Sequence, residues 1–341
     1  MTFGRDRTVL MTLAVLVALL GFCAVQFPFV LSARVLGNLL TDHAFLGMLA
    51  IGMTVVIISG GIDLSVGSVL AFTGVLLGVL ITNQGVNPGL AFAVALAIGT
   101  VFGAVQGAAV HLLRAPAFIV TLAGMFLARG ACFLLTEDSI PIGSATYAAL
   151  NDTALTLPGG TRLTLSALIM LAGVALTALL LRRTKFGANV YALGGDRRAA
   201  ELMGVPVGQT TVGVYAFSGF TAAAGGILFS LYTQSGYPLA AIGIELEAIA
   251  ATVIGGTLLS GGYGSVIGTA LAVLILGLIQ LYVTLQGTLS SWVAKIATGA
   301  LLLLFIGAQR LLSLAPPARP GLSIGNHHGA PDQTPSIGQA P

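Results

Sequence analysis

Residues 59–68, SGGIDLSVGS, hold the polar side chains most unlike their surroundings. Asp63 and Ser65 could hydrogen-bond a polar substrate or hold an ion, yet apolar runs flank them on both sides. A charged group at the centre of a helix in lipid costs about 2.5–3.5 kcal/mol on insertion scales, so Asp63 needs a cavity, a partner or a helix terminus. The two adjacent glycines allow the helix to break here. Asp63 and Ser65 are therefore either helix caps at a corner or polar groups on a route through the bilayer.

The remaining residues give little support to an enzyme. The chain has two lysines, Lys185 and Lys295, and neither lies in G-x-x-x-x-G-K-[ST], which excludes ATP hydrolysis by a P-loop. The four histidines and two cysteines show no metal-ligand spacing. No nucleophile with a base and an orienting group is recognisable. We therefore expect no catalytic residue, no metal and no cofactor.

The composition is typical of an integral membrane protein. Hydrophobic residues make up 56% and charged residues 7% of the 341 positions, whereas soluble proteins average about 25% charged. The candidate crossings are residues 8–27, 45–59, 66–82, 89–113, 117–135, 163–181, 211–233, 246–260, 265–285 and 290–309. The sequence predicts an all-α membrane protein, a polytopic bundle of about ten transmembrane helices with broken or re-entrant segments. Residues 1–314 form this domain, and residues 315–341 are predicted to be a disordered cytoplasmic tail.

The lysines and arginines predict the orientation of the spans. With the N-terminus inside, ten of the 14 lie on the cytoplasmic face, Arg34 and Arg162 on the opposite face, and Arg129 and Lys295 within spans. Positive residues concentrate on the cytoplasmic side of membranes, so both termini are predicted to be cytoplasmic. The pI of about 9.1 reflects this orientation and does not indicate nucleic-acid binding.

The largest predicted cytoplasmic loop, residues 182–210, contains a short helix. Asp196 is its expected N-cap, residues 197–203 form the helix, Gly204 ends it and Pro206 follows. Such a helix on a loop suits docking to a soluble partner. The alternative is a solvated amphipathic connector at the level of the lipid headgroups.

An internal repeat links two distant segments. GGIDLSVGSV from Gly60 resembles GGTLLSGGYGSV from Gly255, with a gap of two residues. Repeats with interrupted helices in matching positions are typical of transporters. The copies are parallel if every segment between them crosses the membrane, and inverted if one short segment does not; shared glycine composition is the third explanation.

Further polar residues are candidates for contact with a substrate or a partner. Gln280 and Tyr282 have polar groups that could meet a substrate within the membrane. Glu245, Glu247 and Tyr237 are expected on the outer side, where docking of a partner, passage of a substrate and plain solvation are all open. Arg129 lies in an apolar run with no acid within four residues, so it must pair across helices or reach the lipid headgroups, and we expect an ion pair.

Four stretches resemble the permease subunit of ATP-binding-cassette sugar importers of the ribose type, and most closely the galactofuranose importer permeases. They are SGGIDLSVGS from Ser59, PAFIVTLAGMFLARG from Pro116, FGANVYALGGDRRAAELMGV from Phe186, and ELEAIAATVIGGTLLSGGYGSVIGT from Glu245. With the intervening spans the resemblance covers about residues 30–310. It implies a bacterial inner-membrane protein that works with ABC ATPase subunits, a periplasmic sugar-binding protein and a second permease, in a heterodimer.

The resemblance also implies a role for the helix in the cytoplasmic loop. In the family this segment inserts into the ATPase, and its positions here are Asp196, Ala199, Ala200, Glu201 and Gly204. Two departures stand out, since Asp196 replaces the usual Asn and Ala115 replaces a common Pro. Either Asp or Asn can cap a helix, so the departures leave only the fine contacts open.

The sequence thus predicts a permease subunit that moves a monosaccharide, with ATP hydrolysis on partner subunits. One alternative is an ion-coupled secondary transporter that uses Asp63 as its ion or proton site. A second is a membrane receptor or structural component that does not transport. The specific sugar is not encoded in recognisable residues of this chain.

Overall fold

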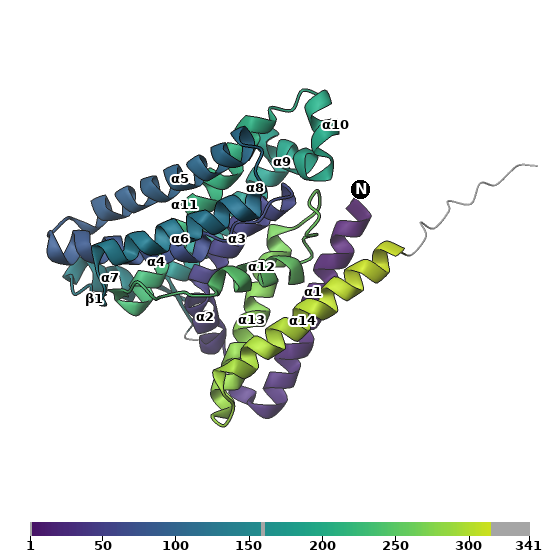
Figure 1. Cartoon of the computed structure of the whole chain (residues 1–341). Helices are drawn as coiled ribbons and strands as arrows, with labels where there is room; N and C mark the ends of the chain where they lie inside the picture. The colour runs from purple at the N-terminus through teal and green to yellow at the C-terminus, as the bar shows by residue number, and fades with distance from the viewer. Residues whose placement is uncertain (1, 158–160, 315–341) are drawn as a thin grey trace, which may run out of the picture.

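The structure is a computed structural model, and it describes residues 2–157 and 161–314. The predicted tail, residues 315–341, lies outside the described residues. Helices dominate (Figure 1). In chain order the elements are α1 (Thr2–Gln26), η1 (Pro28–Leu31), α2 (Ala33–Asp42), α3 (Ala44–Ile58), α4 (Val66–Leu77), η2 (Gly78–Asn83), α5 (Pro88–Leu112), α6 (Ala117–Leu135), β1 (Ile140–Pro141), α7 (Ala145–Asp152), β2 (Ala154–Leu157), β3 (Thr161–Thr164), α8 (Leu165–Arg183), α9 (Lys185–Gly195), α10 (Arg197–Leu202), α11 (Val207–Thr233), β4 (Ser235–Gly236), α12 (Ile244–Ile254), α13 (Val266–Gln286) and α14 (Ser291–Leu314).

The predicted polytopic helical membrane protein is confirmed, but the count of about ten spans is not. Among the described residues, seven helices are long and apolar enough to cross a membrane, or eight if the bent pair α2 and α3 is one span. This pair bends by 57° at His43. The helix α12 has 11 residues, about half of what spans the hydrocarbon core.

The long helix α11 lies at the centre of the bundle, against α5, α3 and α4 (Figure 1). Glycines allow the closest of these approaches. A Cβ at Gly103 of α5 would overlap the carbonyl oxygen of Tyr215 in α11, and one at Gly99 would lie 2.7 Å from the carbonyl oxygen of Gly219. The small residues repeated along α5 therefore serve helix packing, as small residues do in membranes.

Two small antiparallel sheets and α7 form one end of the molecule, which we call the hairpin end (residues 140–157, 161–164 and 235–236). Ile140 pairs with Gly236, and Ala154 with Thr164. Tyr147 of α7 is buried, its hydroxyl bonds Ser230 of α11, and burial raises the pKa of Tyr147 to about 12, which keeps the hydroxyl protonated. The helices α9 and α10 lie at the opposite end, which we call the loop end (residues 185–202; Figure 1).

Candidate functional site

Asp63 lies in the corner between α3 and α4 and is 1% exposed. Its Oδ1 accepts hydrogen bonds from the backbone N (2.9 Å) and the Oγ (2.6 Å) of Ser65, and its Oδ2 from the Oγ of Ser218 in α11 (2.7 Å). Gln106 of α5 donates from Nε2 to the Ser65 Oγ at 3.0 Å. The carboxylate thus connects the corner to two neighbouring helices. It accepts from the backbone just ahead of α4, which begins at Val66.

The two halves of the sequence repeat meet in space. The backbone N of Gly262, in the corner between α12 and α13, donates to the carbonyl oxygen of Ile58 at the end of α3, at 2.8 Å. A Cβ at Gly261 would lie 2.9 Å from the Cα of Gly60. The helices α3 and α12 lie side by side, with the hydroxyls of Thr54 and Thr252 3.5 Å apart. Because both helices also end at this contact, they run in the same direction into the two copies.

The end of α9 fills the space between the two corners. A Cβ at Gly194 would overlap the Ile58 carbonyl oxygen and lie 2.6 Å from the backbone N of Gly262. The hydroxyl of Tyr191 donates to the carbonyl oxygen of Gly264 at 3.1 Å. We call this contact of three backbones the glycine junction (Gly60, Gly194, Gly261 and Gly262). It connects the loop end directly to both interrupted helices.

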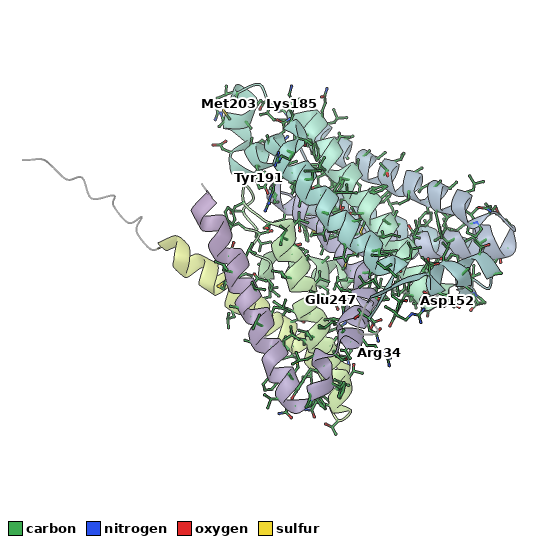
Figure 2. All side chains as sticks on the ribbon, turned by 180° about the vertical axis from the view of Figure 1, so that it is seen from behind. Arg34, Asp152, Lys185, Tyr191, Met203 and Glu247 are labelled. Atoms are coloured by element: carbon green, nitrogen blue, oxygen red, sulfur yellow. The ribbon has the colours of Figure 1, made fainter. Side chains whose placement is uncertain are left out.

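The predicted helix in the loop is confirmed as α10. Asp196 caps it, since its Oδ1 accepts from the backbone N of Arg198 (2.8 Å) and of Ala199 (3.0 Å). Gly204 ends the turn with a φ of +78°, a conformation that favours glycine. The preceding helix α9 was not predicted. Figure 2 shows Lys185 of α9 and Met203, next to α10, together at the loop end.

The surface of the loop end differs in part from the contact positions that the family resemblance implies. Ala200 is fully buried, so its side chain packs inside the protein, whereas Ala199 and Glu201 are exposed. Leu202 is 84% exposed and Met203 72% exposed. Sequence reasoning missed these two residues, although large apolar side chains between a charged turn and a terminating glycine were a usable signal.

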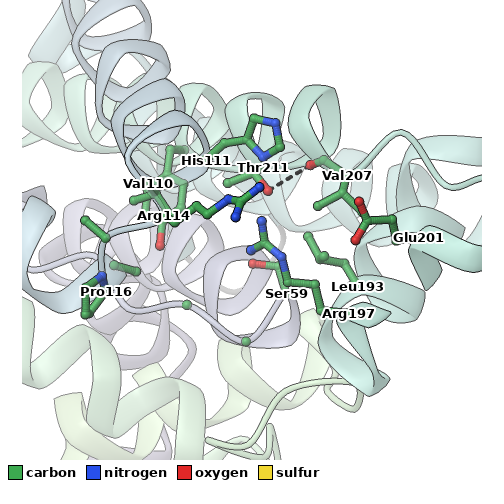
Figure 3. A pocket seen from close by; sticks show the side chains of 15 residues that line it. Ser59, Val110, His111, Arg114, Pro116, Leu193, Arg197, Glu201, Val207 and Thr211 are labelled. Atoms are coloured by element: carbon green, nitrogen blue, oxygen red, sulfur yellow. Dashed lines mark hydrogen bonds between the residues drawn. The ribbon is translucent and has the colours of Figure 1, made fainter. Parts of the chain in front are cut away.

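A cavity of about 620 Å³ lies between α10, the first corner and the α5–α6 connection. Arg114 and Arg197 direct their guanidinium groups into the same space, near His111 and Thr211 (Figure 3). Arg114 has a φ of +51°, an uncommon conformation for a residue other than glycine. Glu201 of α10 lines the far side. Two guanidinium groups that face one space can take a carboxylate from a partner.

The predicted outer residues lie around the start of α12. Glu245 and Glu247 are in its first turn, and Tyr237, 40% exposed, lies in the preceding connection. The expected ion pair of Arg129 is not observed among the described residues. Its Nη1 donates instead to the carbonyl oxygens of Pro238 and Ala240 (2.8 Å to Ala240), which anchors that connection to α6.

The structure separates the four candidates for contact with a substrate. Gln280 lines a cavity together with Glu247. Tyr282 turns to the α1 side of α13, where it packs against Phe22 and Phe27 and accepts from Gln286 Nε2 at 3.0 Å. Asp63 and Ser65 are buried at the first corner. Within the described part of the chain, no three His, Cys, Asp or Glu residues could hold a metal ion together.

Comparisons with known proteins identify relatives over most of the chain. The family model described as branched-chain amino acid transport system / permease component matches residues 35–306. The inner membrane ABC transporter permease protein YjfF of Escherichia coli K12 is 52% identical over 310 residues, which cover 91% of this chain and 94% of that protein. The ribose import permease protein RbsC of the same strain is 36% identical (88% and 92% covered), and the fructose import permease protein FruG of Bifidobacterium longum 33% (90% and 93%). No solved structure matches the chain.

Proposed function

The chain belongs to the branched-chain amino acid transport system / permease component family, and we propose that it moves a monosaccharide of the ribose or galactofuranose class across the bacterial inner membrane. It is a multi-pass permease subunit of an ABC sugar transporter, and a partner ATPase hydrolyses the ATP. The names of two relatives, a ribose and a fructose import permease, support the sugar class. Galactofuranose rests on the resemblance of the four sequence stretches alone.

In the proposed mechanism, α10 transmits the motion of the ATPase. The helix is fixed by its Asp196 cap, and the exposed Leu202 and Met203 supply apolar contact area beside Ala199 and Glu201. Arg114 and Arg197 would donate hydrogen bonds to an acidic side chain of the ATPase in the adjacent cavity. The glycine junction is the observation that carries the proposal. There the backbone of α9 lies so close to both interrupted helices that no room remains for a Cβ at Gly194.

The proposed topology has about ten crossings with both termini in the cytoplasm. The seven long helices, the α2–α3 pair, α12 and α14 supply ten segments. The concentration of lysine and arginine in the loops of one face supports the orientation. The loop end is then cytoplasmic and the hairpin end periplasmic.

The proposed assembly includes two further partners. A periplasmic sugar-binding protein would dock at the outer side, with Tyr237 and Glu245 as candidate contacts, whereas Glu247, the third outer candidate, lines the cavity of Gln280. A second, different permease would complete a heterodimer. The sugar route would use Gln280 and Tyr282 as candidates beside Asp63 and Ser65. The family resemblance supports these assignments.

The alternative, an ion-coupled transporter that uses Asp63, is less favoured. The relatives are ABC permeases. The Asp63 carboxylate is surrounded by hydrogen-bond donors of Ser65 and Ser218 and lines none of the cavities described here. An ion site needs an opening through which the ion can enter.

Replacing the exposed apolar residues of the loop end tests the docking role. We expect the double variant Leu202→Asp and Met203→Asp to reduce co-purification of the ATPase subunit and sugar uptake at least tenfold, because two charges would be buried in the interface. Leu155→Asp is the matched control, since Leu155 is 53% exposed at the hairpin end. Wild-type ATPase binding by the double variant would contradict the proposal, and so would uptake that an uncoupler abolishes without any ATPase subunit.

A further inference from the structure

A second cavity, of about 330 Å³, lies between the α2–α3 bend and the helices α12, α13 and α14. Apolar residues form part of its wall, and five polar side chains from four segments line the rest: His43, Glu247, Gln280, Lys295 and Thr298. Its volume is within the range of about 300–1,000 Å³ that is typical of small-molecule sites. Figure 2 shows Glu247 on the side of the molecule toward Arg34, away from Lys185 and Met203 at the loop end.

The position of this cavity is unusual for polar side chains. Glu247 lies seven residues before the end of α12 at Ile254, about 10 Å along the helix axis. Ionisable groups within membrane-spanning segments are costly and usually functional, and Glu247 and Lys295 come from two helices, α12 and α14, that line the same cavity. Substrate sites in transporters are commonly formed where helices are interrupted, and both the 57° bend at His43 and the short α12 border this cavity.

The polar groups are arranged to bind hydroxyls. His43 Nδ1 lies 3.2 Å from the Leu39 carbonyl oxygen, which can only accept, so Nδ1 is the donor and Nε2 of the neutral ring is an acceptor. Gly277 makes room for this ring, because a Cβ there would lie 2.9 Å from His43 Nδ1. Glu247 accepts, Lys295 donates, and Gln280 and Thr298 can do both.

We infer that this cavity binds the transported monosaccharide during its passage, an assignment that rests on the proposed function. The wall carries one carboxylate and one ammonium group, so its formal charge is balanced and favours a neutral ligand over an ion. A monosaccharide presents donors and acceptors around its ring, as the mixed lining requires. Its apolar C–H faces suit Phe45 and Leu46, which complete the wall.

The single tryptophan of the chain reports on the site directly. Lys295 Nζ lies 5.0 Å from the centre of the Trp292 ring, a cation–π contact that a ligand of Lys295 would alter. We expect D-ribose, D-fructose or D-galactose to change the fluorescence of the purified full-length chain saturably, and Gln280→Leu to weaken this response at least tenfold. The absence of any sugar response in the wild type would overturn the inference.

Uptake by the complete importer in proteoliposomes gives the second test. Thr298→Val keeps the shape of the side chain and removes its hydroxyl, so we expect about a fivefold rise in the apparent KM for the sugar. ATP hydrolysis stimulated by the loaded binding protein should be unchanged. Thr284→Val is the control, because the Thr284 hydroxyl bonds its own helix at the Gln280 carbonyl oxygen (2.9 Å).

The outcomes separate this inference from the proposed function. Wild-type uptake with unchanged KM and sugar preference in Thr298→Val and Gln280→Leu would overturn the binding site and leave the permease role intact. Failure of the wild-type importer to transport these three sugars and galactofuranose would overturn both. A raised KM in Thr298→Val but not in Thr284→Val would support the site.

Discussion

The two corners of the repeat are joined at the glycine junction, but they are built differently. The second corner, between α12 and α13, turns on three glycines with positive φ, at Gly256, Gly261 and Gly262, and contains no charged side chain. The first corner, between α3 and α4, has one such glycine, Gly60, and a buried carboxylate, Asp63, held by Ser65 and Ser218.

This difference indicates what Asp63 contributes. The position that corresponds to it in the second corner is Leu258, and that corner still turns back to pack against the first. A carboxylate is therefore not required to turn the chain. Its bonds connect the first corner to α11, and through Ser65 to Gln106 of α5, so we interpret Asp63 as a tie between helices.

The largest effect is expected where both corners depend on one residue. Gly194→Ala places a methyl group against the Ile58 carbonyl oxygen and the Gly262 amide, neither of which can yield without moving a corner. We expect a loss of more than about 3 kcal/mol in stability, seen as a collapse of the folded yield in detergent.

The neighbouring glycine gives a matched control for this change. A Cβ at Gly195 would have no heavy atom within 4 Å, so Gly195→Ala should leave the yield and thermal midpoint near those of the wild type. Equal behaviour of the two variants would show that the corners are not in contact through Gly194.

The second effect separates the two corners. Asp63→Leu leaves the Ser65 N–H and the Ser218 hydroxyl buried without an acceptor, at about 1–3 kcal/mol each, and should lower the thermal midpoint clearly. Leu258→Ala should cost less, because Leu258 is only partly buried.

An asparagine at position 63 sharpens the interpretation. Asp63→Asn keeps one acceptor oxygen for Ser65, so we expect a smaller loss of stability and retained uptake. Normal assembly with complete loss of transport would instead assign Asp63 to the transport route.

The smallest difference concerns the glycines with positive φ. Gly60 and Gly261 have nearly equal φ values, 84° and 85°, so alanine should strain both backbones by about 1–2 kcal/mol. At Gly261 the methyl group would also lie 2.9 Å from the Gly60 Cα, whereas the nearest atom at Gly60 is 3.8 Å away. We expect Gly261→Ala to be less stable than Gly60→Ala by about 1 kcal/mol in thermal unfolding, and equal midpoints would contradict the close contact.

Local patterns in the sequence determined most of the helices. The span predicted at 117–135 coincides with α6, and the cap at Asp196 and the stop at Gly204 bound α10 as expected. These features depend on apolar runs and capping groups within a few residues, so they can be predicted from the local sequence without knowledge of tertiary contacts. The sheet of β1 and β4 was missed because its strands are two residues long and pair across about a hundred positions.

The tertiary structure alone decided which distant residues meet. No local pattern predicts that Gly194 fills the space between two corners, that Asp63 faces Ser218, or that Glu247 and Gln280 share a cavity with Lys295. These contacts depend on how helices pack, and packing is set by the combined shapes of side chains far apart in the chain. The sequence therefore determined the elements and their ends, whereas packing determined the junction and the cavities between them.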